Sequence, residues 1–465
     1  MSSWYWVKGE VLRKVQILKG KEIYKKSIFK QNQAANTEPP IPITRIFATM
    51  NLHKTLLFVS KLILVLVGLS YFGHMVKHTE KGAEFFGLER TLRNFYNLTD
   101  EFNMLISPKD ERLINIDTDK HINDLQRDVF YLNSLYESFK WHVELKNLKN
   151  DDLIKSWTIS QVDANTSDRG FSHSGPRLPI ILPDSGLLCF LDESKHLLRL
   201  DKNSNIIWHK TDEKYHHSMN LGPEGFLWLC GSNKEKGFWD NTVHKVDINT
   251  GNTIFSKSVA DIFDKNEMEY MTYGLSNSVD ISGDDPYHLN DIEIAKNNTK
   301  YWQKGDVFMS FRHRSAVVVY RPSNDSIIHL IQGPFLNQHD IDITSDSTIS
   351  VFNNNALTFT GQKEVKKTTQ RDTHSYITMY DFNKKVFTFP FQQEMKKHGL
   401  FTQTQGLHHF FEDGSLFVEL QNNGQVAFFS PEGTLIYYGV LNNKVPDSDK
   451  YERTHWPRLY ENSPF

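Results

Sequence analysis

Cysteine is scarce in this chain of 465 residues, which contains only Cys189 and Cys230. Both lie inside apolar runs (LLCFL and LWLCG), where a buried and unreactive thiol is the expected state. The sequence has no CxxC motif and no Cys/His pair at metal-ligand spacing. A zinc site built on cysteine is therefore excluded.

An excess of charge of either sign is also absent. The formal net charge is −3, from 53 lysines and arginines against 56 aspartates and glutamates. Such a chain has no overall basic field to attract nucleic acid, so no nucleic-acid partner is expected. Hydrophobic residues make up 39% and charged residues 23%, a balance typical of globular proteins, which argues against a disordered chain.

Long apolar runs are lacking except at 55–73, TLLFVSKLILVLVGLSYFG, and about 20 such residues can span a bilayer. Lys61 lies near one end of the run, where its side chain can reach the membrane interface. The preceding segment is rich in lysine and arginine, which places it in the cytoplasm. We therefore predict a basic cytoplasmic segment at 1–53, a transmembrane signal anchor at 54–74, and a periplasmic or extracellular remainder. A cleaved signal peptide is the alternative, but no small-x-small cleavage site follows the run.

The segment 75–155 is polar and poor in glycine, and its later part shows heptad spacing. Apolar side chains recur there in alternating steps of three and four, at Ile122, Leu125, Val129, Leu132, Tyr136, Phe139 and Val143. This spacing predicts an amphipathic helix. Two interpretations stay open. In the first, the helix packs its apolar stripe against the following domain. In the second, it forms a self-associating coiled-coil stalk, which would make the protein a homo-oligomer. In either case one helix per chain anchors the protein in the membrane.

Residues 156–465 repeat a unit of two β-hairpins without an intervening helix. The second hairpin of the unit consists of a strand, a polar turn and a strand, and it occurs at 197–209, 243–256, 317–330, 376–389 and 426–439. The preceding strand opens at a turn residue in each unit: Gly186, Gly225, Gly305, Ser347 and Gly414. Apolar residues alternate with period two, and Asp, Asn, Gly and Ser fill the turns.

Four short strands per repeating unit are typical of β-propeller blades. We therefore predict an all-β fold, a six-bladed β-propeller preceded by the transmembrane helix and the helical stalk. Five blades are visible, and the sixth is expected from residues 157–162 together with the C-terminal strand region. A two-sheet sandwich is the alternative, but it does not explain why each unit repeats the same strand order.

Three histidines occupy related places in the repeat. His217 lies eight residues before Gly225, and His339 lies eight before the equivalent Ser347, while His288 precedes Gly305 by 17. Each enters the first strand of a blade, and this strand lines the central channel of a propeller. We therefore expect the three imidazoles to converge at one mouth of the channel.

Arg312 and Asn290 are expected at the same channel mouth. A guanidinium, a carboxamide and several imidazoles form a pocket suited to an oxyanion such as sulfate or phosphate. A histidine can also carry a transferred group covalently, as a nucleophile. The simpler interpretation of any single histidine is that it fills the channel or caps a turn.

Four motifs carry a resemblance to a known family. YHHSMNLGPEGFLWL, DPYHLNDIE, VFMSFRHRSAVVVY and NQHDIDITSDSTISVFNNN resemble, in order, those of the bacterial arylsulfotransferases, over residues 180–440. Members of that family are six-bladed periplasmic propellers that move a sulfuryl group between phenols without a nucleotide donor. The resemblance implies small-molecule partners, an aryl sulfate and a phenol, and no cofactor or metal.

The resemblance also implies roles for particular residues. The nucleophile falls on His339, and the sulfuryl-binding residues fall on His217 or its neighbour His216, His288, Asn290 and Arg312. The chain departs from the family at residues 352–355, FNNN, where an acidic turn ending in glycine is usual. It also lacks the disulfide of some members.

Two other functions are consistent with the same residues. The first is a non-catalytic, membrane-anchored propeller that binds an anionic ligand or a protein partner in the channel mouth. The second is a metal-dependent hydrolase, because three histidines can bind a divalent cation. The adjacent Arg312 argues against a cation. Release of phenol from an aryl sulfate by the purified chain would distinguish the transferase from the binding protein.

Overall fold

The computed structural model describes residues 60–61, 63–68, 113–115, 121–138, 140–160, 174–236, 238–272, 285–356, 374–441, 450–452 and 454–465. They belong to two units, 1–82 and 83–465. In the first unit residues 60–61 and 63–68 are helical. Within the described residues, no helix is both long and apolar enough to cross a membrane. Most of the anchor predicted at 54–74 lies outside the described residues.

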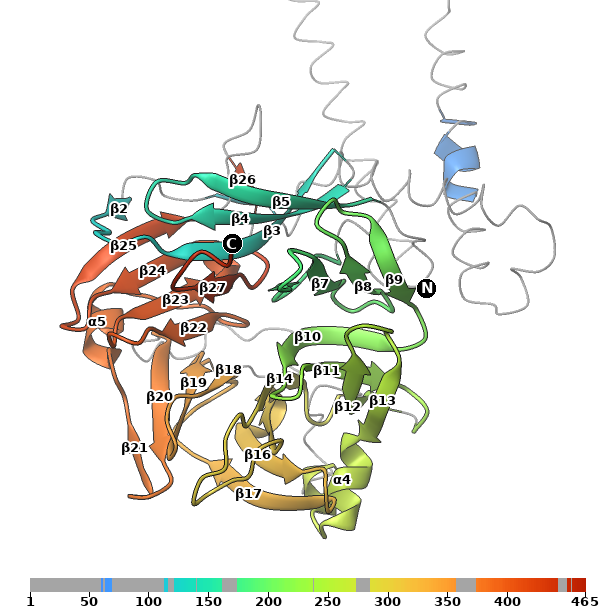
Figure 1. Cartoon of the computed structure of the whole chain (residues 1–465), viewed down its shortest axis with the longest axis vertical. Helices are drawn as coiled ribbons and strands as arrows, with labels where there is room; N and C mark the ends of the chain where they lie inside the picture. Colours follow the sequence, from blue (N-terminus) through green and yellow to red (C-terminus); the bar gives the residue numbers. More distant parts are fainter. Residues whose placement is uncertain are drawn as a thin grey trace, which may run out of the picture. The chain divides into compact units, whose positions relative to one another are not determined.

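The second unit contains six sheets of four or five antiparallel strands, arranged in a ring (Figure 1). This confirms the all-β, six-bladed propeller. We number the blades 1 to 6 and give their strands in pairing order. Blade 1 is β27 (Arg458–Tyr460), β3 (Phe130–Glu137), β4 (Lys140–Asn147) and β5 (Leu153–Ile159); blade 2 is β6 (Ile180–Ile181), β7 (Leu187–Phe190), β8 (Leu197–Leu200) and β9 (Ile206–Lys210); blade 3 is β10 (Lys214–Leu221), β11 (Phe226–Asn233), β12 (Asp240–Asp247) and β13 (Thr253–Ser258).

The other three blades follow the same plan. Blade 4 is β14 (Leu289–Ile294), β15 (Val307–Phe311), β16 (Ala316–Arg321) and β17 (Ser326–Gln332); blade 5 is β18 (His339–Ile343), β19 (Thr348–Asn353), β20 (Tyr376–Asp381) and β21 (Val386–Thr388); blade 6 is β22 (Leu407–Phe410), β23 (Leu416–Leu420), β24 (Gln425–Phe429), β25 (Leu435–Val440) and β2 (Ile122–Asn123). All five predicted hairpins are present, in blades 2 to 6. The sandwich alternative is excluded, because each unit forms a separate sheet.

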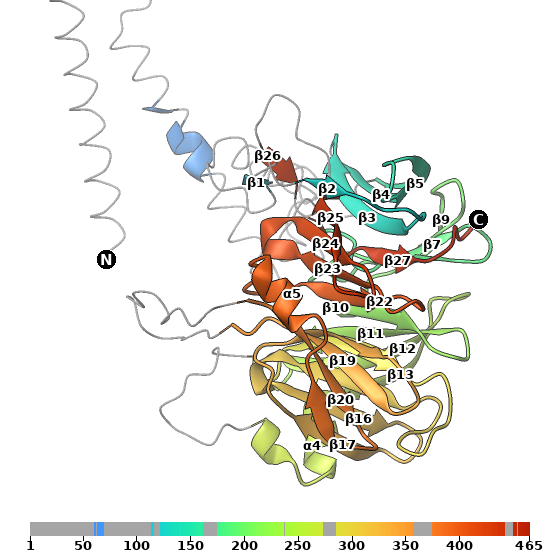
Figure 2. The same ribbon diagram turned by 90° about the vertical axis from the view of Figure 1, so that its left-hand side faces the viewer.

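The remaining elements are short. A separate two-stranded sheet pairs β1 (Leu113–Asn115) with β26 (Lys450–Glu452). The helices α4 (Val259–Lys265) and α5 (Gln392–Lys397) lie at the rim, outside the ring of strands (Figures 1 and 2). Among the described residues, 3₁₀ turns are η4 (Glu269–Met271), η5 (Arg312–Arg314) and η6 (Gln421–Asn423).

Blade 1 closes the ring with strands from both ends of the propeller. Its first strand, β27, comes from the C-terminus and pairs with β3, with Arg458 opposite Leu132 and Tyr460 opposite Phe130. Its last strand, β5, includes Trp157. The sixth blade predicted from residues 157–162 and the C-terminal strand region is therefore confirmed, with β3 and β4 as its middle strands.

The helical stalk predicted for 75–155 is wrong over residues 121–155, which form β2, β3, β4 and most of β5. Both faces of a blade strand are buried against neighbouring blades, so its apolar residues need not show period two. In β3, Tyr131 faces the core toward blade 6 and Leu132 the core toward blade 2. Two such strands and a turn at Ser138, with φ 50°, reproduce heptad spacing. The propeller therefore begins before residue 156.

The core consists of six apolar clusters between neighbouring blades. Between blades 3 and 4, for example, Trp228 and Val243 pack with Met309 and Val318. Each blade is therefore stabilised by apolar contacts with the two blades beside it, so the stability of one blade depends on its neighbours.

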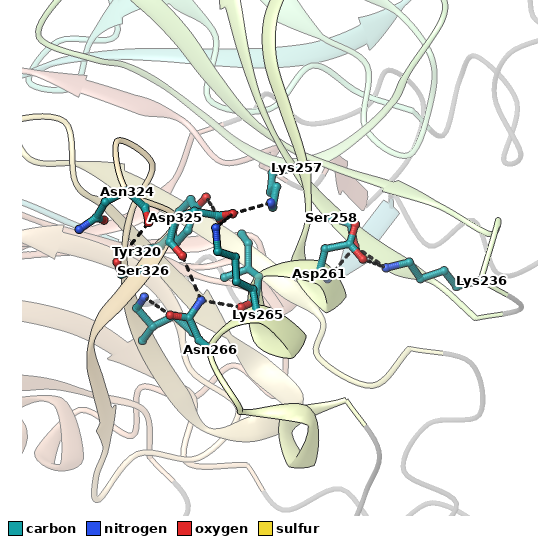
Figure 3. A network of polar contacts seen from close by, with 12 residues as sticks. Lys236, Lys257, Ser258, Asp261, Lys265, Asn266, Tyr320, Asn324, Asp325 and Ser326 are labelled. Atoms are coloured by element: carbon teal, nitrogen blue, oxygen red, sulfur yellow. Dashed lines mark hydrogen bonds and ion pairs between the residues drawn. The ribbon is translucent and has the colours of Figure 1, made fainter.

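A polar network also joins blade 3 to blade 4 near the rim (Figure 3). Asp325, in the turn after β16, accepts bonds at Oδ2 from Lys257 Nζ of β13 at 2.8 Å and from Lys265 Nζ of α4 at 2.9 Å. The hydroxyl of Tyr320 donates to its Oδ1 at 2.6 Å. These bonds hold the pKa of Asp325 below its ordinary value, although partial burial opposes them.

Candidate functional site

Irregular pairing at the start of three inner strands positions the predicted histidines. The register shifts between Tyr215 and Met219 in β10, and again just after His339 in β18. His288 stands directly before β14, which has its own irregularity. Bulges of this kind turn side chains away from the regular alternation. His217 and His288 also have positive φ values, 60° and 54°, which are uncommon for residues with a Cβ and concentrate at functional sites.

The structure brings the predicted imidazoles together. The ring centroids of His217 and His288 lie 4.8 Å apart in an edge-to-face arrangement. The Nδ1 atoms of His216 and His217 are 2.8 Å apart. Trp456 lies between His217 and His339, with its ring centroid 5.8 Å from the former and 6.0 Å from the latter. The expected convergence is therefore observed, and a tryptophan from the C-terminal segment is part of it.

His339 is held in one tautomer by Asn354. The amide nitrogen of Asn354 donates to the carbonyl oxygens of Thr402 and Gln405, at 3.1 and 2.6 Å. Its Oδ1 must therefore accept, and it lies 2.7 Å from His339 Nδ1. The proton of His339 is on Nδ1, so Nε2 carries the lone pair. The backbone N–H of Gln405 donates a long hydrogen bond to this lone pair, at 3.3 Å.

The histidine pair on β10 also has a defined proton arrangement. His216 Nε2 lies 2.9 Å from the carbonyl oxygen of Gly231 and therefore donates to it. In its neutral form His216 then accepts at Nδ1 the proton of His217 Nδ1. The lone pair of a neutral His217 is consequently on Nε2, and this nitrogen can accept a proton.

Burial keeps these imidazoles neutral. The pKa of His339 is well below its ordinary value, first because the ring is buried and then because the Arg312 guanidinium is near. The pKa of His217 is also lowered strongly, by burial and then by the charges of His288 and His216. Burial lowers the pKa of His216 to about 4. A neutral imidazole has a free lone pair, which a nucleophile or a base requires.

Arg312 and Asn290 supply the polar groups predicted beside the histidines. Arg312 Nη1 donates to His313 Nε2 at 2.8 Å, while its Nε makes no hydrogen bond. Asn290 is fully buried and donates from Nδ2 to the carbonyl oxygen of Gln338 at 2.7 Å. It thus links blade 4 to the residue before His339. One amide hydrogen of Asn290 remains for a ligand.

Asp285 orients His288. Its Oδ2 lies 2.6 Å from His288 Nδ1, and its Oδ1 accepts the backbone N–H of His288 at 2.9 Å. Burial alone would raise the pKa of Asp285, but these bonds outweigh it and lower the pKa. The pair leaves Nε2 of His288 for a ligand or a proton.

Asp285, His288 and His313 could also bind a metal ion, because one ligand atom of each lies within 4.8 Å of the others. However, His313 Nε2 already accepts a hydrogen bond from Arg312, and a guanidinium at that position repels a cation. The metal-dependent hydrolase is therefore disfavoured, as the sequence indicated.

Sequence reasoning missed several residues of the site. Arg177 pairs with Asp192 at 2.8 Å and lies over the Trp456 ring, with its Cζ 5.2 Å from the centroid. Asp192 also accepts the backbone N–H of His217 at 3.0 Å. Asn354 belongs to the FNNN run that appeared as a departure from the family, and only its contact with His339 reveals its part. No sequence pattern pointed to Trp456, because this residue lies outside the repeated hairpin units.

The structure is thus a six-bladed propeller that gathers several histidines at the start of its inner strands, with Arg312, directly after β15, beside them. The family model described as Arylsulfotransferase (ASST) matches residues 178–440, more than half of the chain. The chain therefore belongs to the arylsulfotransferase family, which confirms the resemblance seen in the motifs. An arylsulfotransferase-like activity follows from this membership.

No curated protein matches the chain. Among solved structures, it is similar to a protein of unknown function from Bacteroides caccae, with 9% identity, a TM-score of 0.46, and coverage of 72% of this chain and 99% of that one. It is also similar to catalytically inactive virginiamycin B lyase from Staphylococcus aureus with quinupristin, with 9% identity, a TM-score of 0.40, and coverage of 72% and 98%.

Proposed function

We propose that the chain moves a sulfuryl group from a phenolic sulfate ester to another phenol through a sulfohistidine on His339. The observation that carries this proposal is the state of the His339 ring. The ring is buried and neutral, Asn354 holds its Nδ1 proton, and the Nε2 lone pair accepts a long hydrogen bond from Gln405 N–H. A binding pocket for an anion has no need of such a nucleophile.

In the first half of the reaction, His339 Nε2 attacks sulfur, the bond between sulfur and the aryl oxygen breaks, and the phenolate leaves with the electron pair. In the second half, the oxygen of an acceptor phenol attacks the same sulfur and the N–S bond breaks, which restores neutral His339. The acceptor phenol must lose a proton. His217, with a lone pair on Nε2, is suited to accept it and to return a proton to the next leaving phenolate.

Arg312, Asn290 and His288 are proposed to hold the sulfuryl oxygens. Bonds to His313, Gln338 and Asp285 fix the three side chains before the reaction. The other N–H groups of Arg312 and Asn290, and Nε2–H of His288 when the ring is doubly protonated, are then available for the sulfuryl oxygens. Donors arranged in advance stabilise charge that develops in the transition state. Replacing Arg312 or Asn290 by alanine should lower the rate about 100- to 1000-fold, the cost of losing one such donor.

Mass spectrometry after brief exposure to an aryl sulfate tests the proposal. We expect one added sulfuryl group on His339 in the wild type, and neither adduct nor phenol release in His339→Ala. An adduct on His217 or His288 would show that the roles are wrongly assigned within the same reaction. No adduct, together with normal turnover by His339→Ala, would refute the mechanism, and absence of turnover in the wild type would favour the non-catalytic propeller.

We also propose that residues 54–74 anchor the protein in a membrane, with the propeller outside the cytoplasm. The apolar run and the basic segment before it support this, and Ile63, Leu64, Val65 and Val67 of the helical residues are 53–70% exposed. Protease added to spheroplasts, which expose the outer face of the cytoplasmic membrane, should degrade the propeller and spare the segment 1–53. Protection of the propeller in spheroplasts would contradict this topology. The homo-oligomer expected from the stalk is not proposed, because the heptad seam belongs to propeller strands.

A further inference from the structure

A second cavity of about 320 Å³ lies further along the inner strands than the histidine site. It is bordered by β10, β14, β18, β22 and the C-terminal segment. On β18 it begins at Asp340, directly after His339, and includes Asp342. On β14 it includes Asp291 and Glu293, which follow Asn290. β18 and β14 thus carry His339 and Asn290 at their start and carboxylates beyond it.

Asp340, Asp342 and His408 in this cavity have the separation of metal ligands. One ligand atom of each lies within 4.8 Å of the other two. His408 Nδ1 is 2.6 Å from Asp340 Oδ2, and His408 Nε2 is 3.7 Å from Asp342 Oδ2. The two aspartates belong to blade 5 and the histidine to β22 of blade 6. A bound ion would therefore connect two blades.

The ring of His408 provides an independent observation. The ring is fully buried. Its Nδ1 lies 2.6 Å from the Asp340 carboxylate, but this nitrogen has no hydrogen bond of suitable geometry among the described residues. Its Nε2 lies 2.6 Å from the hydroxyl of Ser350, the kind of second contact that fixes the ring of a metal-binding histidine.

Among the described residues, neither basic side chain at the cavity border forms a salt bridge with the carboxylates, although the charges of Arg458 and Lys296 lower the pKa of Asp342. Arg458 borders the cavity, but its guanidinium donates to the carbonyl oxygens of Met219 and Leu178, at 2.8 and 3.1 Å, and to Asn220. Lys296 is exposed. Burial, followed by the charge of Asp340, raises the pKa of Asp342 to about 6. Carboxylates crowded in this way are stabilised by a cation.

We propose that Asp340, Asp342 and His408 bind a divalent transition-metal ion, with Asp291 and Glu293 adding negative charge around it. Two carboxylate oxygens and one imidazole nitrogen suit Zn²⁺ or Mn²⁺ better than Ca²⁺ or Mg²⁺, which prefer oxygen alone. The ion fastens β18 to β22, beside the strand position from which His339 reaches the channel. This site is independent of the proposed sulfuryl transfer, which uses other side chains.

The test is equilibrium dialysis of the chelator-treated full chain against Mn²⁺, with electron paramagnetic resonance of the bound ion. We expect one ion per chain and a spectrum showing coupling to a single imidazole nitrogen. Asp342→Asn and His408→Gln should each weaken binding at least about tenfold, the usual effect of a damaged metal site. His409→Gln is the matched control, because it changes the next residue of β22, also at the cavity border, and it should keep the wild-type affinity.

Three results would overturn the proposal: no stoichiometric ion in the wild type, unchanged binding in both Asp342→Asn and His408→Gln, or binding that disappears only in His288→Gln. The last would assign the ion to Asp285, His288 and His313. Should a variant fail to fold, the wild-type spectrum decides alone, because that other cluster would couple two nitrogens to the ion and the proposed site only one.

Discussion

Asn354 is a positioning residue: it would affect the reaction by holding the ring of His339 in one orientation and one tautomer. Asn354→Ala removes the acceptor that fixes Nδ1–H, so the ring can turn and change tautomer. We expect kcat to fall about 100-fold, the usual effect of a misplaced reacting group, with KM little changed. Asn355→Ala is the matched control. The side-chain amide of Asn355 donates to the carbonyl oxygen of His374 rather than to His339, and kcat should stay near the wild-type value.

Asn354→Asp separates positioning from a general structural effect. The aspartate keeps an acceptor for Nδ1–H but adds a negative charge, which favours the imidazolium form of His339. The acid limb of the profile of kcat/KM against pH should therefore move to higher pH. A limb that stays in place, or an Asn354→Ala variant with full kcat, would show that Asn354 only packs against the loop.

The pH profile of the wild type should reflect the depressed pKa of His339. Only the neutral ring attacks sulfur, so activity is lost as pH falls through the pKa. Because burial and then Arg312 lower that pKa, activity should persist below pH 6.5, the ordinary midpoint of histidine. Arg312→Gln removes the positive charge and should move the limb upward, besides slowing transfer. Single-turnover formation of the adduct between pH 4 and 8 measures both limbs, and a wild-type midpoint at or above 6.5 would contradict the assignment.

The same buried rings couple folding to pH. His217 and His339 have lower pKa values in the folded chain than when unfolded, so the unfolded chain binds more protons in acid. Stability is therefore lost as pH falls below the unfolded histidine value, about 6.5. This loss and the loss of activity are distinguishable, because the first changes the unfolding midpoint and the second changes the rate of the folded protein.

At the scale of elements, hairpins were predictable and blade 1 was not. Each hairpin of blades 2 to 6 combines alternating apolar residues with a turn rich in Asp, Asn, Gly or Ser, and this local chemistry sets its register. Blade 1 has no such local pattern, since β27 pairs with β3 from the other end of the propeller. Its strand β3 places apolar side chains in two cores, and the spacing of these residues together with those of β4 imitated a helix. Likewise, repeat spacing located His217 and His339 but could not locate Trp456, which only ring closure places there.

The hydrogen bonds and ion pairs of Asp325 should contribute measurably to the free energy of unfolding, because they join blade 3 to blade 4. Asp325→Asn keeps an acceptor for Tyr320 but removes the charge that binds Lys257 and Lys265. We expect a loss of about 1–2 kcal/mol in the free energy of unfolding, as for charge-assisted bonds that are partly exposed. Asp264→Asn on α4 removes the same charge from an exposed side chain and should have almost no effect. Chemical unfolding of the three proteins at pH 7 measures the difference.

Unfolding measured at several pH values tests whether the charge of Asp325 causes this loss of stability. The pKa of Asp325 is lower in the folded chain than its ordinary value. Its contribution is therefore present above pH 4 and is lost as pH falls below the unfolded value of about 3.9. The difference in unfolding free energy between the wild type and Asp325→Asn should begin to narrow below pH 4 and keep narrowing toward pH 2, because the folded pKa lies well below the unfolded value. A difference that does not change between pH 4 and pH 2 would show that packing, rather than charge, is responsible.

For the whole molecule, ring closure by β27 should control both stability and the site. Arg458 donates to carbonyl oxygens of Leu178 and Met219 and so ties blade 1 to blades 2 and 3. Removing residues 457–465 deletes these bonds and the pairing with β3, and leaves Trp456 unsupported between His217 and His339. We expect a loss of about 3 kcal/mol or more, from several hydrogen bonds of about 1 kcal/mol each and the buried surface, with activity falling further than the folded fraction.

Removal of residues 461–465 alone is the control for ring closure, because it spares β27. That variant should keep the unfolding midpoint within a few degrees and retain turnover, while the longer truncation should be cut by protease within blade 1. The six interblade cores make the ring cooperative, so an opened blade 1 weakens blades 2 and 6 as well. Equal stability of the two truncations would mean that the cores hold the ring closed without β27, and that the C-terminal strand serves the site alone.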